Sequence, residues 1–221
     1  MLSTRSILRD LSDTDRSVVH SRCKPLRVDK KEEVITQGSE GRDMFIVMSG
    51  QLKISALSEQ GKELAFGLLG PGDTFGEMGM LDGQARSATV TTIEPCELLV
   101  LARSTFEQLV RDYPSLAINL MVILSQRLRH TSRLYEDAVF LGVQNRLARF
   151  LIHTSRAEDS AQGTYSLDVS LSQYELGTLV NASRESINKL LNDWEECGWI
   201  EREKGKIRIV KPDELKVAMA L

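Results

Sequence analysis

The fold of the C-terminal part of the chain can be predicted from residues 171–215, LSQYELGTLVNASRESINKLLNDWEECGWIEREKGKIRIVKPDEL. Ser172 and Ser183 are residue types that cap helices, and apolar residues at helical spacing follow each of them. Asn181, between the two predicted helices, tolerates the left-handed backbone of a tight turn. Gly198 ends the second helix. Two short helices joined by such a turn predict a helix-turn-helix.

A short β-hairpin is predicted directly after these helices. WIERE (199–203) and KIRIV (206–210) are two apolar-polar runs on either side of Lys204-Gly205. Such a pattern is typical of two antiparallel strands joined by a tight turn. The C-terminal part is therefore expected to be a winged helix-turn-helix.

The second helix of this module begins with polar side chains on the side opposite its apolar stripe. In a helix-turn-helix these positions meet base edges in the major groove, where Arg and Lys suit guanine and Glu accepts from cytosine. A solvated face with an i,i+4 pair between Glu185 and Lys189 is the alternative, but the complete module favours DNA. The candidate DNA-binding residues are Ser172, Gln173, Ser183, Arg184, Glu185, Ser186, Asn188 and Lys189.

The overall charge gives no support to DNA binding through bulk attraction. The chain of 221 residues has 28 Lys and Arg against 31 Asp and Glu, a formal net charge of −3. Up to Asn145 there are 17 basic and 19 acidic residues (net −2), and 11 and 12 after it (net −1). Contact with DNA must therefore come from a local patch.

A long helix is predicted upstream, from Pro114 to about Phe140, because no Gly or Pro interrupts the stretch. Such a helix is about 40 Å long. Its apolar and small residues recur three or four apart, which favours a coiled-coil seam between two subunits. Packing against the core of its own domain is the alternative. The stripe consists of Ala117, Leu120, Leu124, Leu128, Thr131, Leu134 or Tyr135, and Ala138.

Short apolar runs punctuated by glycine fill the stretch from Val28 to Leu101. They predict many short antiparallel strands that close into a small β-roll. Further helices are expected over about Ser6–Arg22, Ser104–Arg111 and Val143–Thr154, with a hinge at Leu141-Gly142 and an exposed loop at 157–163.

The predicted fold class is therefore α+β. An N-terminal antiparallel β-roll is followed by a long dimerisation helix and by the C-terminal winged helix-turn-helix. The expected domain limits are 1–112, 113–140 and 141–221.

GDTFGEMGMLDGQARSATV, residues 72–90, contains the candidate ligand site. Gly76 lets the backbone approach a ligand closely, and a short helical turn starting at Glu77 points free N–H groups at an anion. Arg86 and Ser87 add a guanidinium fork and a hydroxyl, which suit a phosphate. The Glu77 carboxylate suits a sugar hydroxyl. A structural salt bridge between Glu77 and Arg86 is the alternative, so composition alone indicates only an anion pocket.

The sequence resembles the cAMP receptor protein/FNR family of bacterial transcription regulators. The resemblance is carried by three features in this order: FGEMGMLDGQARSATV (75–90), the long helix and ASRESINKLL (182–191). The resemblance covers nearly the whole chain and implies a β-roll of the cyclic-nucleotide-binding type. It implies that Glu77 binds the ribose hydroxyl, and Arg86 and Ser87 the cyclic phosphate. The other implied ligand-binding residues are Ile54 and Phe66 beside the base, Gly76, Met78 and Ala88 in the cradle, and Arg127, Thr131 and Ser132 on the long helix.

The resemblance makes cAMP the expected allosteric ligand, with Ser132 contributed by the partner subunit. cGMP remains open because the Ser87 hydroxyl can also serve guanine. An iron–sulfur cluster is not expected, because Cys23 is the one cysteine near the N-terminus. The histidines are isolated, so no haem or other metal is expected. Lys189 replaces an arginine of the cAMP receptor protein, so the expected palindromic TGTGA-like site is altered at one base.

Other classes of function have weaker support. The chain has no CxxC pair, no catalytic triad pattern and no Walker loop. It also lacks an apolar run of about 18 residues. We therefore expect a cytoplasmic, non-enzymatic protein without a membrane partner. Together with the predicted seam and helix-turn-helix, the resemblance implies that it binds double-stranded DNA as a homodimer through 113–140 and contacts RNA polymerase. The alternative is a cyclic-nucleotide-binding regulatory subunit whose C-terminal module contacts a protein.

Overall fold

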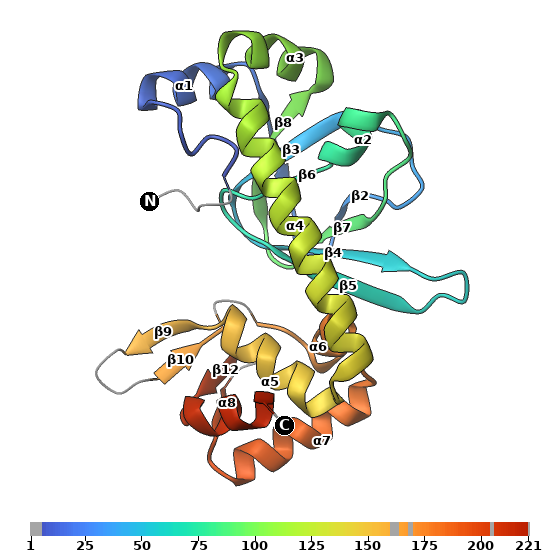
Figure 1. The fold of residues 1–221 in the computed structure, drawn as a ribbon, viewed down its shortest axis with the longest axis vertical. Helices are drawn as coiled ribbons and strands as arrows, with labels where there is room; N and C mark the ends of the chain where they lie inside the picture. Colours follow the sequence, from blue (N-terminus) through green and yellow to red (C-terminus); the bar gives the residue numbers. More distant parts are fainter. Residues whose placement is uncertain (1–5, 160–163, 168–169, 204–205, 221) are drawn as a thin grey trace. The chain divides into compact units, whose positions relative to one another are not determined.

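The computed structural model describes residues 6–159, 164–167, 170–203 and 206–220. They form two compact units, one up to Thr131 and one from Ser132 onward. Figure 1 labels most of the elements of both units. No helix of the described residues combines the length and hydropathy that a membrane span requires.

The first unit is built on two four-stranded antiparallel sheets, with strand orders β1-β8-β3-β6 and β2-β7-β4-β5. Apolar side chains from both sheets, including the stacked rings of Phe45 and Phe75, form the core between them. The predicted β-roll is therefore present. Its strands are β1 (Lys24–Val28), β2 (Glu33–Ile35), β3 (Asp43–Ser49), β4 (Leu52–Leu57), β5 (Glu63–Leu69), β6 (Thr74–Phe75), β7 (Thr89–Thr92) and β8 (Cys96–Ala102).

A second core lies where helices pack against the sheet that contains β3 and β8. It joins Met44, Ile46 and Leu101 of the strands to apolar residues of four helical segments and of the N-terminal turns. The helices of this unit are α1 (Asp13–Ser21), α2 (Glu77–Asp82), α3 (Arg103–Asp112) and α4 (Ser115–Phe140), of which α4 continues into the second unit. The predicted helices over 104–111 and 114–140 are thus confirmed.

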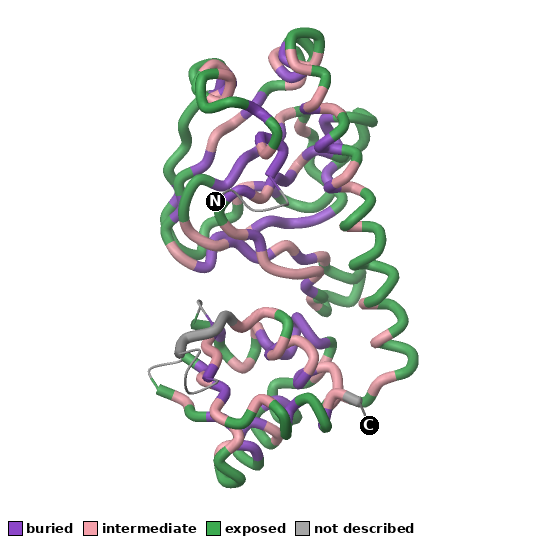
Figure 2. Tube along the Cα trace, turned by 60° about the vertical axis from the view of Figure 1, so that its left-hand side comes forward, coloured by how far each residue is buried: buried purple, intermediate pink, exposed green. Residues whose placement is uncertain are grey.

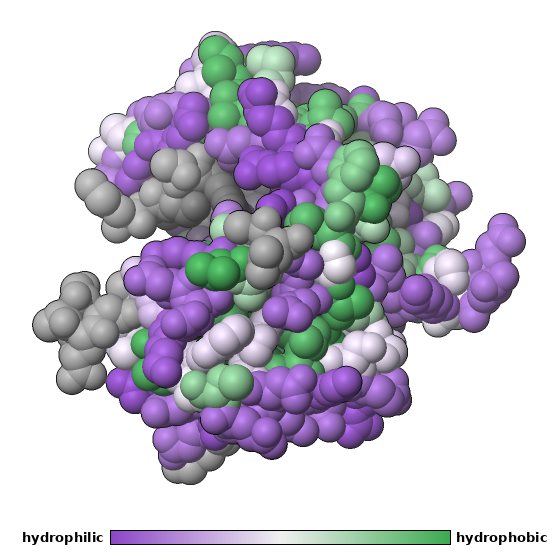
Figure 3. All heavy atoms as spheres, turned by 60° about the horizontal axis from the view of Figure 1, so that its bottom comes forward, coloured by the Kyte–Doolittle hydropathy of each residue, from purple (hydrophilic) through white to green (hydrophobic). Residues whose placement is uncertain are grey.

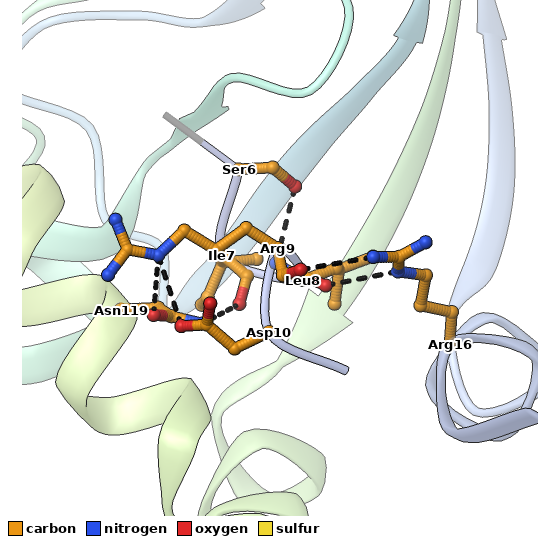
Figure 4. A network of polar contacts seen from close by, with 7 residues as sticks. All are labelled: Ser6, Ile7, Leu8, Arg9, Asp10, Arg16 and Asn119. Atoms are coloured by element: carbon orange, nitrogen blue, oxygen red, sulfur yellow. Dashed lines mark hydrogen bonds and ion pairs between the residues drawn. The ribbon is translucent and has the colours of Figure 1, made fainter. Parts of the chain in front are cut away.

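The N-terminal helix is shorter than predicted, because it begins at Asp13 and not near Ser6. Ser12 caps it by accepting a hydrogen bond from the Asp15 backbone N–H. Residues 6–11 form turns that side chains hold in place (Figure 4). Asn119 of α4 donates to the Ile7 carbonyl (3.0 Å) and accepts from Arg9 Nε (3.0 Å). The apolar residues Ile7, Leu8 and Leu11 are buried, but they lie in turns and not in a helix.

Helix α4 uses two faces, and the predicted stripe runs across both. Leu116, Leu120 and Ile123 are buried in the helix-side core and Leu124 packs against it, so Leu120 and Leu124 do not belong to a free seam. Beyond Leu124 most of the helix is exposed (Figure 2). Exposed side chains instead recur at alternating spacings of three and four, which is a heptad pattern. This exposed heptad face consists of Ile118, Met121, Ser125, Leu128, Ser132, Tyr135 and Val139.

The second unit contains the predicted helix-turn-helix and a larger sheet than expected. Its helices are α5 (Val143–Thr154), α6 (Gln173–Val180), α7 (Arg184–Glu196) and α8 (Pro212–Ala220). Its strands are β9 (Arg156–Asp159), β10 (Thr164–Ser166), β11 (Ile200–Glu203) and β12 (Lys206–Ile209), in the order β11-β12-β10-β9.

The hairpin β11-β12 is present, but β12 also pairs with β10, so the predicted two-stranded wing belongs to a four-stranded sheet. The expected loop at 157–163 is likewise wrong for 157–159, which lie in β9, whereas 160–163 fall outside the described residues. Residues 157–159 have no apolar–polar alternation, so nothing in the local sequence indicated the pairing between β9 and β10. Figure 3 shows hydrophilic side chains over much of the visible surface, with hydrophobic ones in patches between them.

Candidate functional site

The glycine-rich segment folds around the Arg86 side chain. Gly76 has φ +79° and precedes α2, so it adopts a backbone that other residues rarely accept. A Cβ atom at Gly76 would lie 2.9 Å from Arg86 Nη1, and one at Gly41 would lie 2.7 Å from Arg86 Nη2. The two glycines therefore leave the space that the guanidinium occupies.

Arg86 is 7% exposed and is held by backbone carbonyls. Its Nη1 donates to the Gly76 carbonyl (2.7 Å) and its Nη2 to the Asp43 carbonyl (2.8 Å). Burial lowers the pKa of the guanidinium from its ordinary value, while the carboxylates of Asp43 and Glu77 oppose this shift. A guanidinium has five N–H donors, so donors remain for an anion after these two bonds.

The carboxylate of Glu77 is paired with Arg127 and not with Arg86. Glu77 is 3% exposed, and its Oε1 accepts from Arg127 Nη1 at 2.5 Å. Arg127 also donates through Nη2 to the carbonyl of Thr74. The alternative of a Glu77–Arg86 salt bridge is therefore not what the structure contains. Instead, Arg127 joins α4 to the start of the glycine-rich segment.

The remaining predicted ligand residues differ in exposure. Ser87 is exposed and its hydroxyl lies 3.5 Å from Sδ of Met78, which is itself half exposed. Ala88 is buried, and Ile54 and Phe66 are half-buried on the paired strands β4 and β5. The Phe66 carbonyl lies 3.2 Å from Nε2 of His130. Thr131 and Ser132 are exposed on α4.

This arrangement suits a ligand that has an anionic group and a hydroxyl. Arg86 and Ser87 offer donors near the glycine turn, and the Glu77 carboxylate accepts from a hydroxyl. No group of three His, Cys, Asp or Glu side chains in the described part of the chain is arranged to hold a metal ion. The donors of Arg86 and Ser87 and the Glu77 carboxylate together fit a sugar phosphate.

In the second unit, side-chain caps fix the two helices of the helix-turn-helix. Ser172 and Glu175 form a capping box at the start of α6, and Ser183 caps α7 by accepting from the Ser186 N–H. Asn181 ends α6 with φ +51° and ψ +57°, the left-handed conformation predicted for the turn. A Cβ at Gly177 would lie 2.7 Å from the Ala182 carbonyl oxygen, so glycine permits the close turn.

The exposed face of α7 carries most of the predicted DNA-binding residues. Arg184, Glu185, Ser186, Asn188 and Lys189 are all exposed, as the caps Ser172 and Ser183 are. Gln173 of α6 donates to Oδ1 of Asn188 (2.8 Å), which joins the two helices across this face. None of the ion pairs found among the described residues links Glu185 to Lys189. The alternative of a face stabilised by that i,i+4 pair therefore has no support.

Glu185 is an anion at the start of α7. A hydrogen bond from its own backbone N–H lowers the pKa of the carboxyl group, and hydrogen bonding with Ser183 lowers it further. A pocket of about 540 Å³ lies beside this face. It is lined by residues of α6, α7 and the hairpin, among them Ser172, Gln173, Arg184, Arg202 and Lys206.

Comparison with known proteins identifies both units. The family described as "Cyclic nucleotide-binding domain" matches residues 25–113, and "Crp-like helix-turn-helix domain" matches residues 145–218. The chain belongs to the cAMP receptor protein/FNR family. Members of this family are DNA-binding transcription regulators and not enzymes.

Two relatives illustrate the extent of the similarity. The CRP-like cAMP-activated global transcriptional regulator of Mycobacterium tuberculosis is 28% identical over 215 residues, which cover 97% of this chain and 96% of that protein. The cAMP-activated global transcriptional regulator CRP of Escherichia coli is 28% identical over 177 residues, which cover 80% and 84%.

A solved structure with a similar fold belongs to a regulator that responds to a different nucleotide from the two cAMP-activated relatives. The c-di-GMP responsive global regulator CLP of Xanthomonas campestris is similar with a TM-score of 0.78 and 26% identity, covering 90% of this chain and 99% of that one. Family membership therefore leaves the ligand of this cAMP receptor protein/FNR family member to be decided by its own site.

Sequence reasoning missed the partners that complete the ligand site. It did not foresee that Arg127 pairs with Glu77, or that the Asp43 carbonyl holds Arg86, because 50 and 43 residues separate these partners. One signal was available, since Arg127 lies four residues before Thr131 and so shares its side of the helix.

Proposed function

We propose that this protein is a dimeric transcription regulator that binds a cyclic nucleotide, cAMP in the first instance, and then binds a palindromic TGTGA-like DNA site. The cradle around Arg86 carries the proposal: a buried guanidinium, a glycine turn, an exposed serine hydroxyl and a buried carboxylate meet in one short segment. Relatives described as cAMP-activated regulators support the choice of ligand.

The proposed roles follow from the chemistry of each group. Arg86 and Ser87 bind the cyclic phosphate, with Gly76, Met78 and Ala88 forming the walls of the cradle. Glu77 accepts from the ribose hydroxyl and Arg127 holds Glu77 in place. The base lies beside Ile54 and Phe66 and reaches Thr131 of one subunit and Ser132 of the partner subunit.

Dimerisation is proposed to use the exposed heptad face of α4. Apolar side chains occupy five of its seven positions, and Ser125 and Ser132 occupy the other two. A seam of this kind buries the apolar side chains against the same face of a second copy. Ser132 then lies in the seam itself, where it is available to a ligand bound in the partner.

The ligand is proposed to act by stabilising one arrangement of the dimer. It changes the DNA affinity only as far as it binds the DNA-competent state better than the other state. Contact with Thr131 and the partner subunit's Ser132 orders α4 up to Phe140, ahead of the break at Leu141-Gly142 that precedes α5. Two recognition helices α7 then meet successive major grooves about 34 Å apart.

Calorimetric titration of the purified dimer with cAMP, cGMP and c-di-GMP tests the ligand. Binding to a palindromic TGTGA-type duplex, measured with and without each nucleotide, tests the coupling. We expect cAMP to bind and to strengthen DNA binding by up to about 150-fold. Thr131→Ala with Ser132→Ala should abolish that gain and leave ligand-free DNA binding unchanged. If no nucleotide binds while DNA binding persists, the ligand half of the proposal is wrong.

The same proposal includes a cytoplasmic location, a contact with RNA polymerase and the DNA-binding residues predicted from the sequence. Arg184 and Lys189 are proposed to read base edges, while Ser172, Gln173 and Ser183 position the helices on the phosphate backbone. The domain limits 1–112, 113–140 and 141–221 assign ligand binding, dimerisation and DNA binding in that order. A gel-shift assay separates this regulator from a subunit that contacts a protein, because only the regulator retards the duplex.

A further inference from the structure

The hydroxyl of Thr74 is buried and unsatisfied. Thr74 is 0% exposed, and its Oγ1 atom has no hydrogen-bond partner among the residues that the structure describes. Buried side-chain polar atoms usually have a partner, and one without a partner destabilises the state that contains it. This hydroxyl calls for an explanation because it lies two residues before Gly76, where the cradle begins.

Strand pairing places the Thr74 side chain on the helix side of its sheet. Thr74 lies opposite Ile46, and Phe75 lies opposite Phe45. Residues directly opposite in an antiparallel pair share a face. Phe45 and Phe75 belong to the core between the sheets, whereas Ile46 belongs to the core beneath the helices. The Thr74 hydroxyl is therefore on the same side as α4.

Arg127 reaches this strand from α4. It lies four residues after Ile123, which is buried in the helix-side core, so both residues are on the side of α4 that meets the sheet. Its Nη2 donates to the carbonyl of Thr74 and its Nη1 to Glu77. The Thr74 hydroxyl is thus on the same residue that already binds this guanidinium.

We propose that Thr74 is a positioning residue for nucleotide binding, whose hydroxyl accepts a hydrogen bond from Arg127 when a ribose hydroxyl binds Glu77. This inference rests on the proposed function. A ribose hydroxyl that donates to Glu77 shares the carboxylate with Arg127 and weakens the Arg127–Glu77 bond. The guanidinium has spare N–H donors, and the Thr74 hydroxyl is an unsatisfied acceptor on the residue whose carbonyl the guanidinium already binds. The ligand-free state bears the cost of the unsatisfied hydroxyl, and the bound state recovers it.

Two matched variants separate the hydroxyl from the shape of the side chain. Thr74→Val keeps the shape and removes the hydroxyl, while Thr74→Ser keeps the hydroxyl. Thermal unfolding of the ligand-free protein and calorimetric titration with cAMP are measured on the full-length dimer at one protein concentration.

Thr74→Val is expected to raise the Tm of the ligand-free protein by about 3 °C. It should also weaken cAMP binding about tenfold, which corresponds to about 1.4 kcal/mol. Thr74→Ser should bind cAMP within about twofold of the wild type. A purely structural role would move stability and affinity in the same direction, so a higher Tm with a weaker Kd is the signature of the proposal.

An unchanged Kd in Thr74→Val overturns the role of Thr74, whatever happens to its Tm. A Tm that falls also overturns it, because the hydroxyl would then already be satisfied in the ligand-free state, for instance by a water molecule. If the wild type binds neither cAMP, cGMP nor c-di-GMP, the proposed function itself has failed and this inference fails with it. Wild-type binding together with an unaffected Thr74→Val variant isolates failure of the inference alone.

Discussion

Replacing Asn119 by alanine should release the N-terminal segment from α4. Asn119 is 1% exposed and makes two hydrogen bonds to that segment, one to the Ile7 carbonyl and one from Arg9 (Figure 4). Ile7 and Leu8 are 1% and 3% exposed, so the freed carbonyl has little access to water. The segment is therefore attached at a point where loss of one side chain leaves a buried acceptor.

The size of the effect follows from the unequal surroundings of the two bonds. The Ile7 carbonyl is left buried and unsatisfied, which costs about 1–3 kcal/mol. The Arg9 side chain is 31% exposed and keeps its bond to Asp10 Oδ2 (3.1 Å). Loss of the Arg9–Asn119 hydrogen bond therefore adds little to the destabilisation. We expect Asn119→Ala to lower the free energy of unfolding by about 1–3 kcal/mol. Asp10→Ala, the matched control, removes only the exposed second partner of Arg9 and should lower it by less than about 1 kcal/mol.

Urea denaturation followed by circular dichroism measures both variants at one protein concentration, since the proposed dimer couples stability to concentration. Hydrogen exchange supplies the local readout. In Asn119→Ala the amide of Leu11, which bonds to the Leu8 carbonyl, should exchange faster. A loss below about 0.5 kcal/mol in Asn119→Ala would contradict this prediction, because the buried carbonyl would then have found another partner. An equal loss in Asp10→Ala would also contradict it, because the effect would then not come from the buried carbonyl.

Three further predictions concern other parts of the chain. Arg86→Lys should weaken cAMP binding at least about tenfold, because an ammonium cannot replace a guanidinium that bonds two carbonyls and still faces a phosphate; calorimetry measures this, and an unchanged Kd would contradict the cradle. Arg184→Ala should weaken the free energy of DNA binding by about 1–3 kcal/mol and relax specificity at one base pair. Gel-shift titrations with duplexes that differ at single base pairs measure this, and equal weakening on all duplexes would make Arg184 a phosphate contact instead. Iodoacetamide at pH 8 should label Cys197, which is exposed, and spare Cys23. Burial raises the pKa of the Cys23 thiol to about 11, so almost none of this thiol is the reactive thiolate at pH 8. Mass spectrometry locates the label, and fast modification of Cys23 in the native protein would contradict its burial.

Local sequence patterns predicted the elements whose stability is local. Ser172 and Ser183 fixed the starts of α6 and α7, because a capping hydroxyl needs only the backbone two or three residues further on. Asn181 predicted the turn for the same reason. The start of α1 was missed because apolar burial at Ile7 and Leu8 imitates helical spacing.

Periodicity was less informative where one element meets two surroundings. Over 26 residues, α4 packs against its own domain at Leu120 and Leu124 and then exposes Leu128 and Tyr135. A straight α-helix drifts by about 20° per heptad relative to a 3.5-residue repeat. A stripe spaced by three or four residues therefore passes from one face to the other, and burial is what assigns each position.

Residue propensity, capping and turn chemistry act over a few residues. They were therefore enough to predict the α+β class, the β-roll, the long helix, the helix-turn-helix and the glycine turn at Gly76. Tertiary structure alone decided that Arg127 pairs with Glu77, that the Asp43 and Gly76 carbonyls hold Arg86, and that the Thr74 hydroxyl is buried without a partner. The physical reason is that a charge or a polar atom takes its partner from whatever the fold brings within hydrogen-bond distance. Sequence spacing sets no such distance between residues 50 positions apart.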